Sequence, residues 1–397
     1  MSFKKRSLIL PIYIPSFLLS AVEGALMPIL PVSATNYGLG LAEASVVAGV
    51  MFVSAMLFEI PASWINTRLG ERRSMLLATV SAAVLLAFAY LELGYWALLV
   101  AAAGFGASHS LFGLARHSLL THLTSGPNRP KAMALLGGMF RGGWAFGPIV
   151  SGAIILAFGL QAGYLAAIVM CLGAGVSVLT VRAEKLASSP SGLHGNMWEV
   201  AKREAPKLLT LGVASGIISG ARAIRLMGLP LLAVALGIDA ATSSLIFGIT
   251  GLIDFALFYL SGVIMARYGK FWSSVPTLMM LGVSYIFTFW VTDLFTFWVL
   301  AAVTALANAL SAGINMVLGA DLAPEGARSE FLASFRLLTS GGSALAPVVI
   351  SAFTALISLP AALAITGLGN FLGAYLFWKY LPKYAPDQKR PQGNKKL

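Results

Sequence analysis

The chain carries the segment SWINTRLGERR at residues 63–73 and a related segment, GVIMARYGKFW, at residues 262–272. The Arg-x-Gly of the second segment lies 199 residues after that of the first (267 − 68). The same ungapped shift also superposes other glycine, proline and arginine residues: Pro31 on Pro230, Gly38 on Gly237, Gly49 on Gly248, Arg129 on Arg328, Gly143 on Gly342 and Pro148 on Pro347. Chance rarely aligns these residue types at one offset, so we predict two related halves in the same orientation.

Composition places both halves in a membrane. Of the 397 residues, 58% are hydrophobic and 11% are charged, against roughly 45–50% and about 25% in soluble domains. Apolar runs of about 20 residues, the length that crosses a hydrocarbon core of about 30 Å, recur along the chain and leave no room for a soluble domain. The first run continues from Leu8 to about Leu30, too far for a cleavable signal peptide, so we expect it to be retained.

We therefore expect an all-α integral membrane protein with twelve transmembrane helices, built as two parallel repeats of six helices. The expected helices lie near residues 8–32, 44–66, 74–92, 95–121, 132–158, 161–182, 206–232, 242–266, 273–292, 294–319, 331–357 and 360–381. The longest polar interval, 183–205, is the natural joint between the repeats. The predicted domains are a bundle at 1–183, a cytoplasmic linker at 184–205, a second bundle at 206–381 and a basic cytoplasmic tail at 382–397.

The net charge of +12 is distributed unevenly. Lysine and arginine occur near the amino terminus, in alternate loops and in the tail, whereas the intervening loops contain neither. This positive-inside pattern predicts that both termini are cytoplasmic and that the protein is a multi-pass protein of the plasma (inner) membrane. The positive charge thus indicates orientation and contact with anionic lipid rather than a nucleic-acid partner. The single cysteine, Cys171, provides neither a disulfide nor a cysteine metal site.

The repeated loop segment resembles a signature of the major facilitator superfamily, G-x-x-x-D-R-x-G-R/K-R/K, and the resemblance covers nearly the whole chain. The second half keeps Gly262, Arg267 and Gly269 and has alanine in place of the aspartate, while the first half keeps Arg68 and Gly70 and has threonine there. The resemblance implies a twelve-helix transporter in which this loop latches the cytoplasmic helix ends together. Since the acid is absent from both halves, the charge-based form of that latch is not expected here.

The predicted fifth helix contains GWAFGPIVSG at residues 143–152. This segment resembles the antiporter signature g-x-x-x-G-P-x-x-G-G of the same superfamily, with one glycine replaced by serine, and the resemblance implies an exporter similar to the drug/proton antiporters. Gly147 allows close helix approach and Pro148 allows bending, so simple tight packing is the alternative interpretation. Val100 stands where the family has an arginine linked to protons. Proton coupling therefore needs its own argument.

Ionisable residues inside the predicted helices are the candidates for function, because a charge at the bilayer centre costs roughly 2.5–3.5 kcal/mol even on lenient insertion scales. Glu23 lies near the middle of the first helix, and the 199-residue shift carries it onto Arg222 of the seventh. We hypothesise that the two residues face each other across a central cavity and that Glu23 carries the coupled proton. A static ion pair is the alternative. Asp254, at the middle of the eighth helix, is the second candidate proton carrier.

Other polar residues indicate the wall of such a cavity. Ser219 and Arg222 share a helix face, and His109 of the fourth helix corresponds to Asn308 of the tenth, with Asn315 on the same face. Arg141 lies about 13 Å inside its helix, too deep to reach water along the lipid. The arginines within the helices outnumber the acids: Arg116, Arg141, Arg222, Arg225 and Arg336 against Glu23, Glu59 and Asp254. A net positive cavity favours an anionic or zwitterionic substrate.

We expect a secondary active transporter that moves a small organic solute by alternating access, through proton-coupled efflux. The alternatives are an importer or exchanger of an anionic metabolite and, in another class, a non-transporting membrane sensor or scaffold on the same fold. An enzyme, a cofactor and a metal site are not expected, because the chain has no phosphate-binding loop and its four histidines lack metal-binding spacing. The expected partners are a small-molecule substrate, protons and the lipid bilayer, and the protein is expected to be a monomer.

Overall fold

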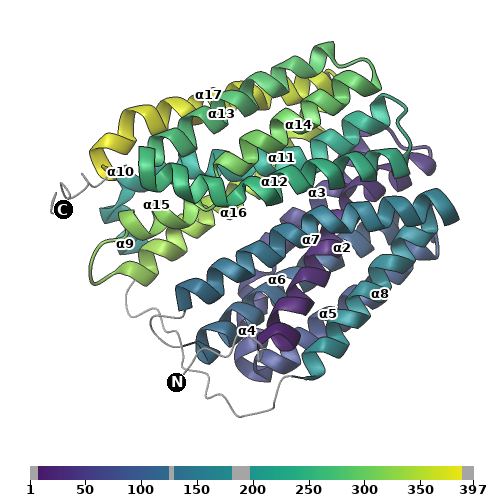
Figure 1. The fold of residues 1–397 in the computed structure, drawn as a ribbon, viewed down its shortest axis with the longest axis horizontal. Coiled ribbons are helices and arrows are strands. Elements are labelled where there is room, and N and C mark those ends of the chain that lie inside the picture. The colour runs from purple at the N-terminus through teal and green to yellow at the C-terminus, as the bar shows by residue number, and fades with distance from the viewer. Residues whose placement is uncertain (1–7, 125–128, 181–196, 387–397) are drawn as a thin grey trace, which may run out of the picture.

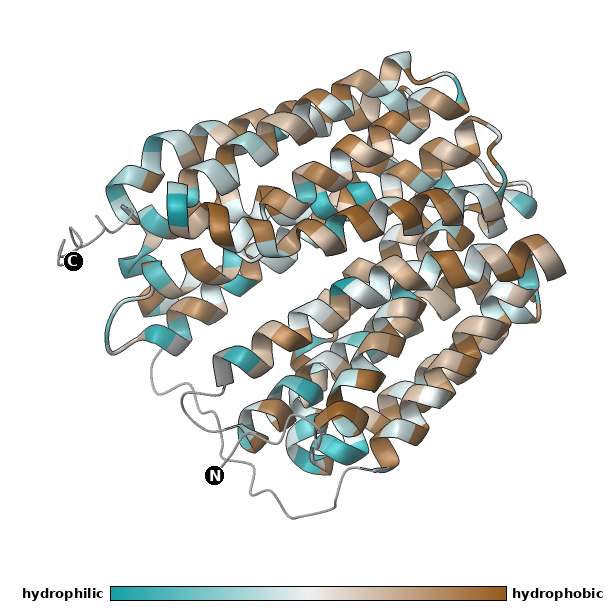
Figure 2. Ribbon diagram, in the orientation of Figure 1, coloured by the Kyte–Doolittle hydropathy of each residue, from teal (hydrophilic) through white to brown (hydrophobic). Residues whose placement is uncertain are grey.

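The fold is all-α and spans a membrane. The computed structural model describes residues 8–124, 129–180 and 197–386, which form helices joined by short loops (Figure 1) and include no strand. Eleven of these helices are long and apolar enough to cross a membrane, and a bent pair makes up to twelve. Apolar residues run along the helices, and hydrophilic ones gather toward their ends and at a few inner positions (Figure 2). The predicted fold class is confirmed.

Each half is a series of six membrane-crossing spans with short accessory turns. The first half consists of η1 (Ile9–Tyr13), α2 (Ile14–Asn36), α3 (Leu41–Leu57), α4 (Glu59–Leu69), α5 (Glu71–Tyr90), α6 (Tyr95–Leu123), α7 (Arg129–Phe158) and α8 (Leu160–Leu179). The second consists of α9 (Met197–Arg203), α10 (Ala205–Lys207), η3 (Leu208–Gly212), α11 (Val213–Ala235), α12 (Ala240–Tyr268), α13 (Lys270–Phe287), η4 (Thr288–Trp290), α14 (Leu294–Leu310), α15 (Ile314–Leu322), α16 (Arg328–Leu356) and α17 (Leu359–Tyr384).

The offset found in the sequence relates the two halves element by element. A shift of 199 residues carries η1 and α2 onto η3 and α11 with the same bounds, and carries α6 onto the span from the start of α14 to the end of α15. Figure 1 shows the halves side by side as two bundles, purple to blue and green to yellow. The two parallel repeats are confirmed. The domain limits stay a prediction, because most of the linker at 184–205 and of the tail at 382–397 lies outside the described residues.

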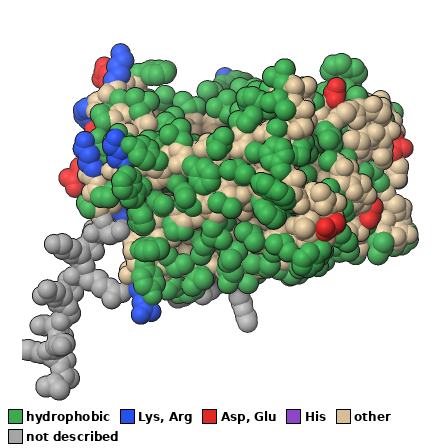
Figure 3. All heavy atoms as spheres, turned by 90° about the horizontal axis from the view of Figure 1, so that it is seen from above, with side chains coloured by type: hydrophobic (Ala, Val, Ile, Leu, Met, Phe, Trp, Pro, Cys, Tyr) green, Lys and Arg blue, Asp and Glu red, His purple; other side chains and the backbone are tan. Residues whose placement is uncertain are grey.

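The two ends of the molecule differ in charge. Arg68, Arg72 and Lys270 lie at the end where the repeated loop segments are, which we call the basic end. The other end, which we call the opposite end, has Glu43 in the first turn of α3 and Asp239 in the loop before α12. In Figure 3 lysine and arginine gather toward one end of the visible face, and acidic side chains alone mark the other. The structure thus has the charge asymmetry on which the orientation of the termini was predicted.

Two spans that we expected to be continuous are broken. In each case the equivalent span of the other repeat is unbroken, and a single residue explains this difference. The span predicted at 44–66 bends by 52° between α3 and α4, because Pro61 lacks an N–H and its ring would clash with the carbonyl of Leu57. The span predicted at 294–319 is interrupted between α14 and α15, where Gly313 has φ 79°. The corresponding residues of the other repeat are Leu260 and Leu114, and α12 and α6 are unbroken there.

Glycines set the closest helix contacts. A Cβ on Gly147 of α7 would lie 2.0 Å from the carbonyl oxygen of Ala21 in α2, and one on Gly342 would lie 2.0 Å from that of Gly216. The fifth helix of each half thus packs against the first at contact distance. Between the halves, a Cβ on Gly49 would lie 2.1 Å from the Cβ of Pro347. Gly49 is the ninth residue of the bent span that starts with α3 at the opposite end and continues through α4 to Leu69, so this contact closes the halves together on the side of the opposite end.

The loop at the basic end is held by a different contact from the one the signature implies. Glu71 Oε1 lies 3.0 Å from His122 Nδ1, which joins α5 to α6. The equivalent contact of the second half, 199 residues on, joins Lys270 Nζ to Asp321 Oδ2 at 2.6 Å. The two contacts occupy the same position with the acid on opposite helices. A latch between the third and fourth spans is therefore present in both halves without the missing aspartate.

Candidate functional site

A polar cavity of about 560 Å³ lies between the two halves. Its walls come from α3, α4, α6 and α7 of the first half and from α15 and α16 of the second. Glu59 and Arg336 line it near the basic end, where Arg336 Nη2 lies 3.2 Å from Glu59 Oε1 and 65% of the Arg336 side chain is exposed. His109 and Arg116 line it more deeply. The cavity therefore reaches solvent at the basic end, while the Gly49 contact closes the halves beyond it.

Glu23 lies between this cavity and a smaller one. It is 6% exposed, and its carboxylate accepts a hydrogen bond of 2.6 Å from Trp144 Nε1. Its Oε2 also lies 3.7 Å from His109 Nε2. His109 lines the large cavity, and Trp144 lines the smaller one together with Arg141 and Asp254. Glu23 is thus buried beside the imidazole of His109, which lies between it and the large cavity.

Arg116 is the most buried large side chain of the cavity wall, 2% exposed. Its guanidinium lies 4.1 Å from the ring centre of Phe140 and 5.7 Å from that of Phe112. Its Nε and Nη1 are buried and have no hydrogen-bond partner within the described part of the chain. The side chain is therefore held inside the protein and does not extend into water at the end of α6.

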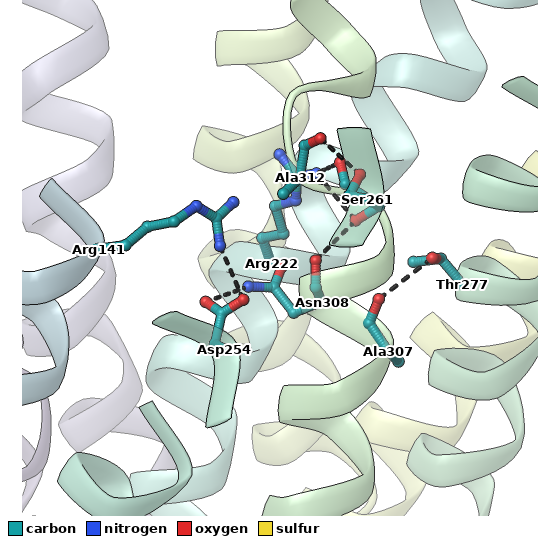
Figure 4. Close-up of polar contacts among 9 residues, drawn as sticks. Arg141, Arg222, Asp254, Ser261, Thr277, Ala307, Asn308 and Ala312 are labelled. Atoms are coloured by element: carbon teal, nitrogen blue, oxygen red, sulfur yellow. Dashed lines mark hydrogen bonds and ion pairs between the residues drawn. The ribbon is translucent and has the colours of Figure 1, made fainter. Parts of the chain in front are cut away.

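Arg141 and Asp254 join the halves at mid-depth. Arg141 Nη1 of α7 lies 2.7 Å from Asp254 Oδ1 of α12, and 14% and 7% of the two side chains are exposed. Asn308 Nδ2 of α14 donates to the other carboxylate oxygen at 2.8 Å. Figure 4 shows the arginine and the amide converging on Asp254 from two helices. Asp254 therefore has a cation and a hydrogen-bond donor as partners, and its charge is compensated.

Arg222 hydrogen-bonds to Ser311 at the break between α14 and α15. Its Nη2 donates to the carbonyl oxygen of Ser311 at 2.5 Å and to the hydroxyl at 2.9 Å. Beside it, Ser261 Oγ donates to the carbonyl oxygen of Ala312 at 2.7 Å (Figure 4). These donors satisfy carbonyls that the interrupted helix leaves free. Arg222 thus stabilises a broken helix.

The alternative of a static ion pair between Glu23 and Arg222 is wrong for this structure. Glu23 pairs with Trp144 and His109, whereas Arg222 pairs with Ser311. The other predicted cavity residues of the second half also have internal partners, since Asn315 Nδ2 donates to Ser219 Oγ at 2.9 Å. The predicted polar residues are therefore divided between a first-half cluster at the cavity and a second-half network around the helix break.

The residues of the two signature segments have conformational and packing roles. Gly70 and Gly269 both have positive φ, 78° and 96°, where a side chain would be strained. The Arg68 guanidinium lies 3.9 Å from the ring centre of Trp64, and that of Arg267 lies 5.4 Å from that of Tyr268. A Cβ on Gly262 would meet open space, with no atom within 4 Å.

The proline of the second signature segment borders a cavity. Pro148 lies inside α7 and lines the smaller of the two cavities, beside Trp144. It therefore lies close to the Glu23 cluster, although it contributes no polar group to it.

Sequence reasoning missed two contacts of the site. Trp144 donates to Glu23, but a tryptophan in an apolar helix gives no sign of facing inward; its one signal was its place within the segment 143–152. Glu59 contacts Arg336 and Ser340 of the other half. No spacing within one chain segment could have indicated that contact.

The architecture defines the class of protein. Two parallel six-helix repeats with a polar cavity between them are a recurrent plan of secondary transporters. The sequence matches the family described as Major Facilitator Superfamily over residues 12–273 and again over 211–397. The chain therefore belongs to the Major Facilitator Superfamily, and it is a multi-pass membrane protein and a secondary transporter by family and fold. A comparison with curated proteins gave no match.

Solved structures of transporters share this fold over nearly the whole chain. A POT family transporter in complex with a thioalcohol-conjugated peptide matches with a TM-score of 0.80 and 11% identity, over 96% of this chain and 97% of that one. A bacterial homologue of the human lysosomal transporter Spinster, inward-facing and occupied, matches with a TM-score of 0.75 and 14% identity, over 98% and 100%. At these identities the likeness establishes the fold alone.

Proposed function

We propose that this chain is a proton-coupled transporter of a small organic solute in the plasma membrane, with both termini in the cytoplasm. The solute enters the cavity between the halves, and the halves rock about it to expose it to either side. The charge asymmetry between the basic and opposite ends supports this orientation. The cavity has a volume of about 560 Å³, within the range of sites that enclose small organic ligands.

The surroundings of Glu23 carry the proposal of proton coupling. This acid is buried, and its direct partners are the neutral indole of Trp144 and the titratable imidazole of His109. The other charged group that acts on it through space is Arg116. No arginine or lysine contacts this carboxylate directly among the described residues, and buried acids of this kind form proton relays in membrane transporters. His109 lines the cavity, so a proton from cavity water reaches Glu23 through one imidazole.

Outward transport is the first candidate for direction. Efflux was predicted from the resemblance of residues 143–152 to an antiporter signature. Packing accounts for the glycines of that segment, because a Cβ on Gly143 or Gly147 would meet the backbone of α2, and Gly342 repeats the contact in the second half. Helix packing of this kind is compatible with either direction of transport. The resemblance to the antiporter signature is therefore the only support for efflux.

The balance of buried charge favours the second candidate, import or exchange of an organic anion. Arg141 is neutralised by Asp254 and Arg336 by Glu59. Arg116, Arg222 and Arg225 have no acidic partner at contact distance among the described residues, and Glu23 is the one acid of this region left without an arginine there. A positive interior attracts negative solutes.

The proposal is tested in proteoliposomes that enclose a pH-sensitive dye. Under an inward proton gradient, organic anions and lipophilic cations are added outside, one at a time. Solute-dependent acidification indicates that proton and solute move together, and acidification driven by preloaded solute leaving the vesicle indicates antiport. Glu23→Gln, which keeps an acceptor for Trp144, is expected to remove this proton flux. Glu43→Gln, an acid in the first turn of α3 at the opposite end, is the matched control.

Two results would contradict the proposal. If Glu23→Gln retained solute-dependent proton flux equal to that of the parent protein, Glu23 would not be the coupling acid. If neither anions nor cations produced flux with the parent protein in any gradient, a sensor or scaffold on this fold would become the better interpretation.

A further inference from the structure

Arg116 places a guanidinium in the cavity wall, and two of its three nitrogens lack a hydrogen-bond partner among the described residues. The side chain is 2% exposed, it lines the cavity, and its Nε and Nη1 have no acceptor among the described residues. A buried charge left without a partner is strongly unfavourable. Such an unsatisfied group calls for an explanation, and a ligand that supplies the missing acceptor during function is one.

The neighbouring acids do not supply that acceptor. Glu59 Oε1 is used by Arg336 and Ser340, at 3.2 and 3.3 Å. Glu23 acts on Arg116 through its charge, but its carboxylate accepts from Trp144 and faces His109. The guanidinium also lies against the two aromatic rings described above. Such rings stabilise a cation weakly and leave the edge of the fork unoccupied.

The equivalent position of the second half indicates that helix packing does not require an arginine here. The 199-residue shift carries Arg116 onto Asn315. Asn315 Nδ2 donates to Ser219 Oγ at 2.9 Å and to the carbonyl oxygen of Ser215 at 3.3 Å. The asparagine thus joins two helices, whereas no such bond is found for the Nε and Nη1 of Arg116 within the described residues. The first half differs by presenting a cation to the cavity.

Apolar side chains also line the cavity that contains this cation. Phe52 and Met56 of α3, Leu114 of α6 and Met316 of α15 line the same space as Arg116. A ligand that fills this space therefore needs an apolar body and an anionic head. Guanidinium groups bind carboxylates through two parallel hydrogen bonds, which gives both strength and orientation.

We propose that Arg116 binds the oxyanion group, a carboxylate in the first instance, of a small organic acid whose apolar part lies against Phe140 and the α3 side of the cavity. This assignment rests on the proposed transport function, and it names the class of the solute. It also predicts whether the proton and the anion move in the same direction or in opposite directions. Protonation of Glu23 removes the negative charge that competes with the ligand for Arg116, so proton and anion binding favour each other. Anion and proton are therefore carried in the same direction.

Four charged or titratable groups surround Glu23, where the proton binds, and Arg116, where the anion binds. His109 lies between Glu23 and the cavity, and His117, Glu59 and Arg336 line the cavity on the side of the basic end. Glu59 and Arg336 neutralise each other at 3.2 Å. The coupling between Glu23 and the bound anion is thus the interaction that changes when Glu23 gains a proton, and Glu23→Gln isolates it.

Binding is measured on the purified full-length protein in detergent, through the ligand-induced rise in melting temperature and the quenching of tryptophan fluorescence. The probes are 3-phenylpropanoate, benzenesulfonate, the neutral 3-phenylpropanamide and inorganic phosphate. We expect 3-phenylpropanoate to bind and the amide not to bind, and phosphate to bind more weakly because it lacks the apolar body. Arg116→Gln is expected to weaken carboxylate binding about tenfold or more, while Glu43→Gln, in the first turn of α3 and outside this cavity, leaves it unchanged.

The stability of the ligand-free variants separates a binding role from a structural one. Arg116→Gln is expected to leave the melting temperature equal or higher, because it removes a buried charge that has no acidic partner. Arg141→Gln, which strips a partnered buried acid of its cation, is expected to lower it. Arg116→Lys keeps the charge without the planar fork and is expected to bind with intermediate affinity. Glu23→Gln is expected to bind the carboxylate at neutral pH as tightly as the parent protein binds it in acid.

The outcomes distinguish this site from the transport proposal. No thermal or fluorescence response to any of the anions, or equal responses of the parent protein and Arg116→Gln, would overturn the site even if proton-coupled flux of another solute were normal. Carboxylate binding that depends on Arg116, in a protein without proton-coupled flux, would support the site and refute the transport mechanism. Tighter binding with the amide than with the carboxylate would also overturn the assignment.

Discussion

Arg141 and Asp254 are the residues whose pairing most directly affects stability. They lie 2.7 Å apart, their side chains are 14% and 7% exposed, and they belong to different halves. Removing one member of a buried ion pair leaves the other charge uncompensated, which costs about 3–5 kcal/mol. We expect Asp254→Asn to lower the melting temperature markedly and the double variant Arg141→Met/Asp254→Leu to recover most of the loss. Thermal unfolding of the purified variants measures both effects.

An exposed ion pair serves as the control for that prediction. Arg203 Nε lies 3.2 Å from Glu204 Oε1, and 60% of the arginine side chain is exposed. Surface pairs contribute about 0–1 kcal/mol, so Arg203→Gln should change the melting temperature little. If Asp254→Asn were as mild as Arg203→Gln, the carboxylate would not be the partner that keeps Arg141 buried.

The sequence predicts which ionisable residues lie inside the membrane, but not which of them contact each other. Glu23, Arg222 and Asp254 are identified by the cost of a charge in an apolar helix. Their partners depend on how each helix is rotated and bent, which one sequence does not contain. Glu23 therefore has Trp144 as its partner rather than Arg222, and the carbonyls that bind Arg222 are free only because α14 ends at Leu310.

The break between α14 and α15 is the element that distinguishes the second half from the first. Gly313 has φ 79° and immediately precedes α15, and a side chain in this left-handed conformation costs roughly 1–2 kcal/mol. Gly313→Ala should therefore destabilise the protein by about that amount. Gly262→Ala, in regular helix of α12 with nothing within 4 Å, should instead stabilise it by up to about 1 kcal/mol. Melting temperatures of the two variants that shift in the same direction would refute this account of the break.

The repeat predicts the bounds of the helices better than local propensity does. The 199-residue offset places the start of α11 from the start of α2 and the start of α13 from that of α5. What the offset cannot predict is where one copy has lost the local conformation of the other. Pro61 was a readable signal for the bend that follows α3, whereas a glycine such as Gly313 is indistinguishable in sequence from the many glycines that only pack helices.

The whole molecule is closed at the opposite end and open through the cavity at the basic end. Two equivalent contacts hold the closed end, one from each repeat. A Cβ on Gly49 would lie 2.1 Å from the Cβ of Pro347, and one on Gly248 would lie 2.3 Å from Cγ1 of Ile149. In a carrier that works by alternating access, these contacts must separate in every cycle. Their glycines therefore influence the equilibrium between the two states.

A methyl group at either glycine should shift that equilibrium without touching the site. Overpacking costs roughly 1–3 kcal/mol, which corresponds to a change of about 5–150-fold in a two-state ratio. We expect Gly49→Ala and Gly248→Ala each to favour the state open at the opposite end, whereas Gly137→Ala, with nothing within 4 Å, leaves the ratio unchanged. Spin labels at Gln161→Cys and Phe295→Cys, one on each half, report the separation of that end, and Cys171 is buried and does not compete for label. If Gly49→Ala and Gly248→Ala gave the same distance distribution as the control Gly137→Ala, these two glycines would not control closure of the opposite end.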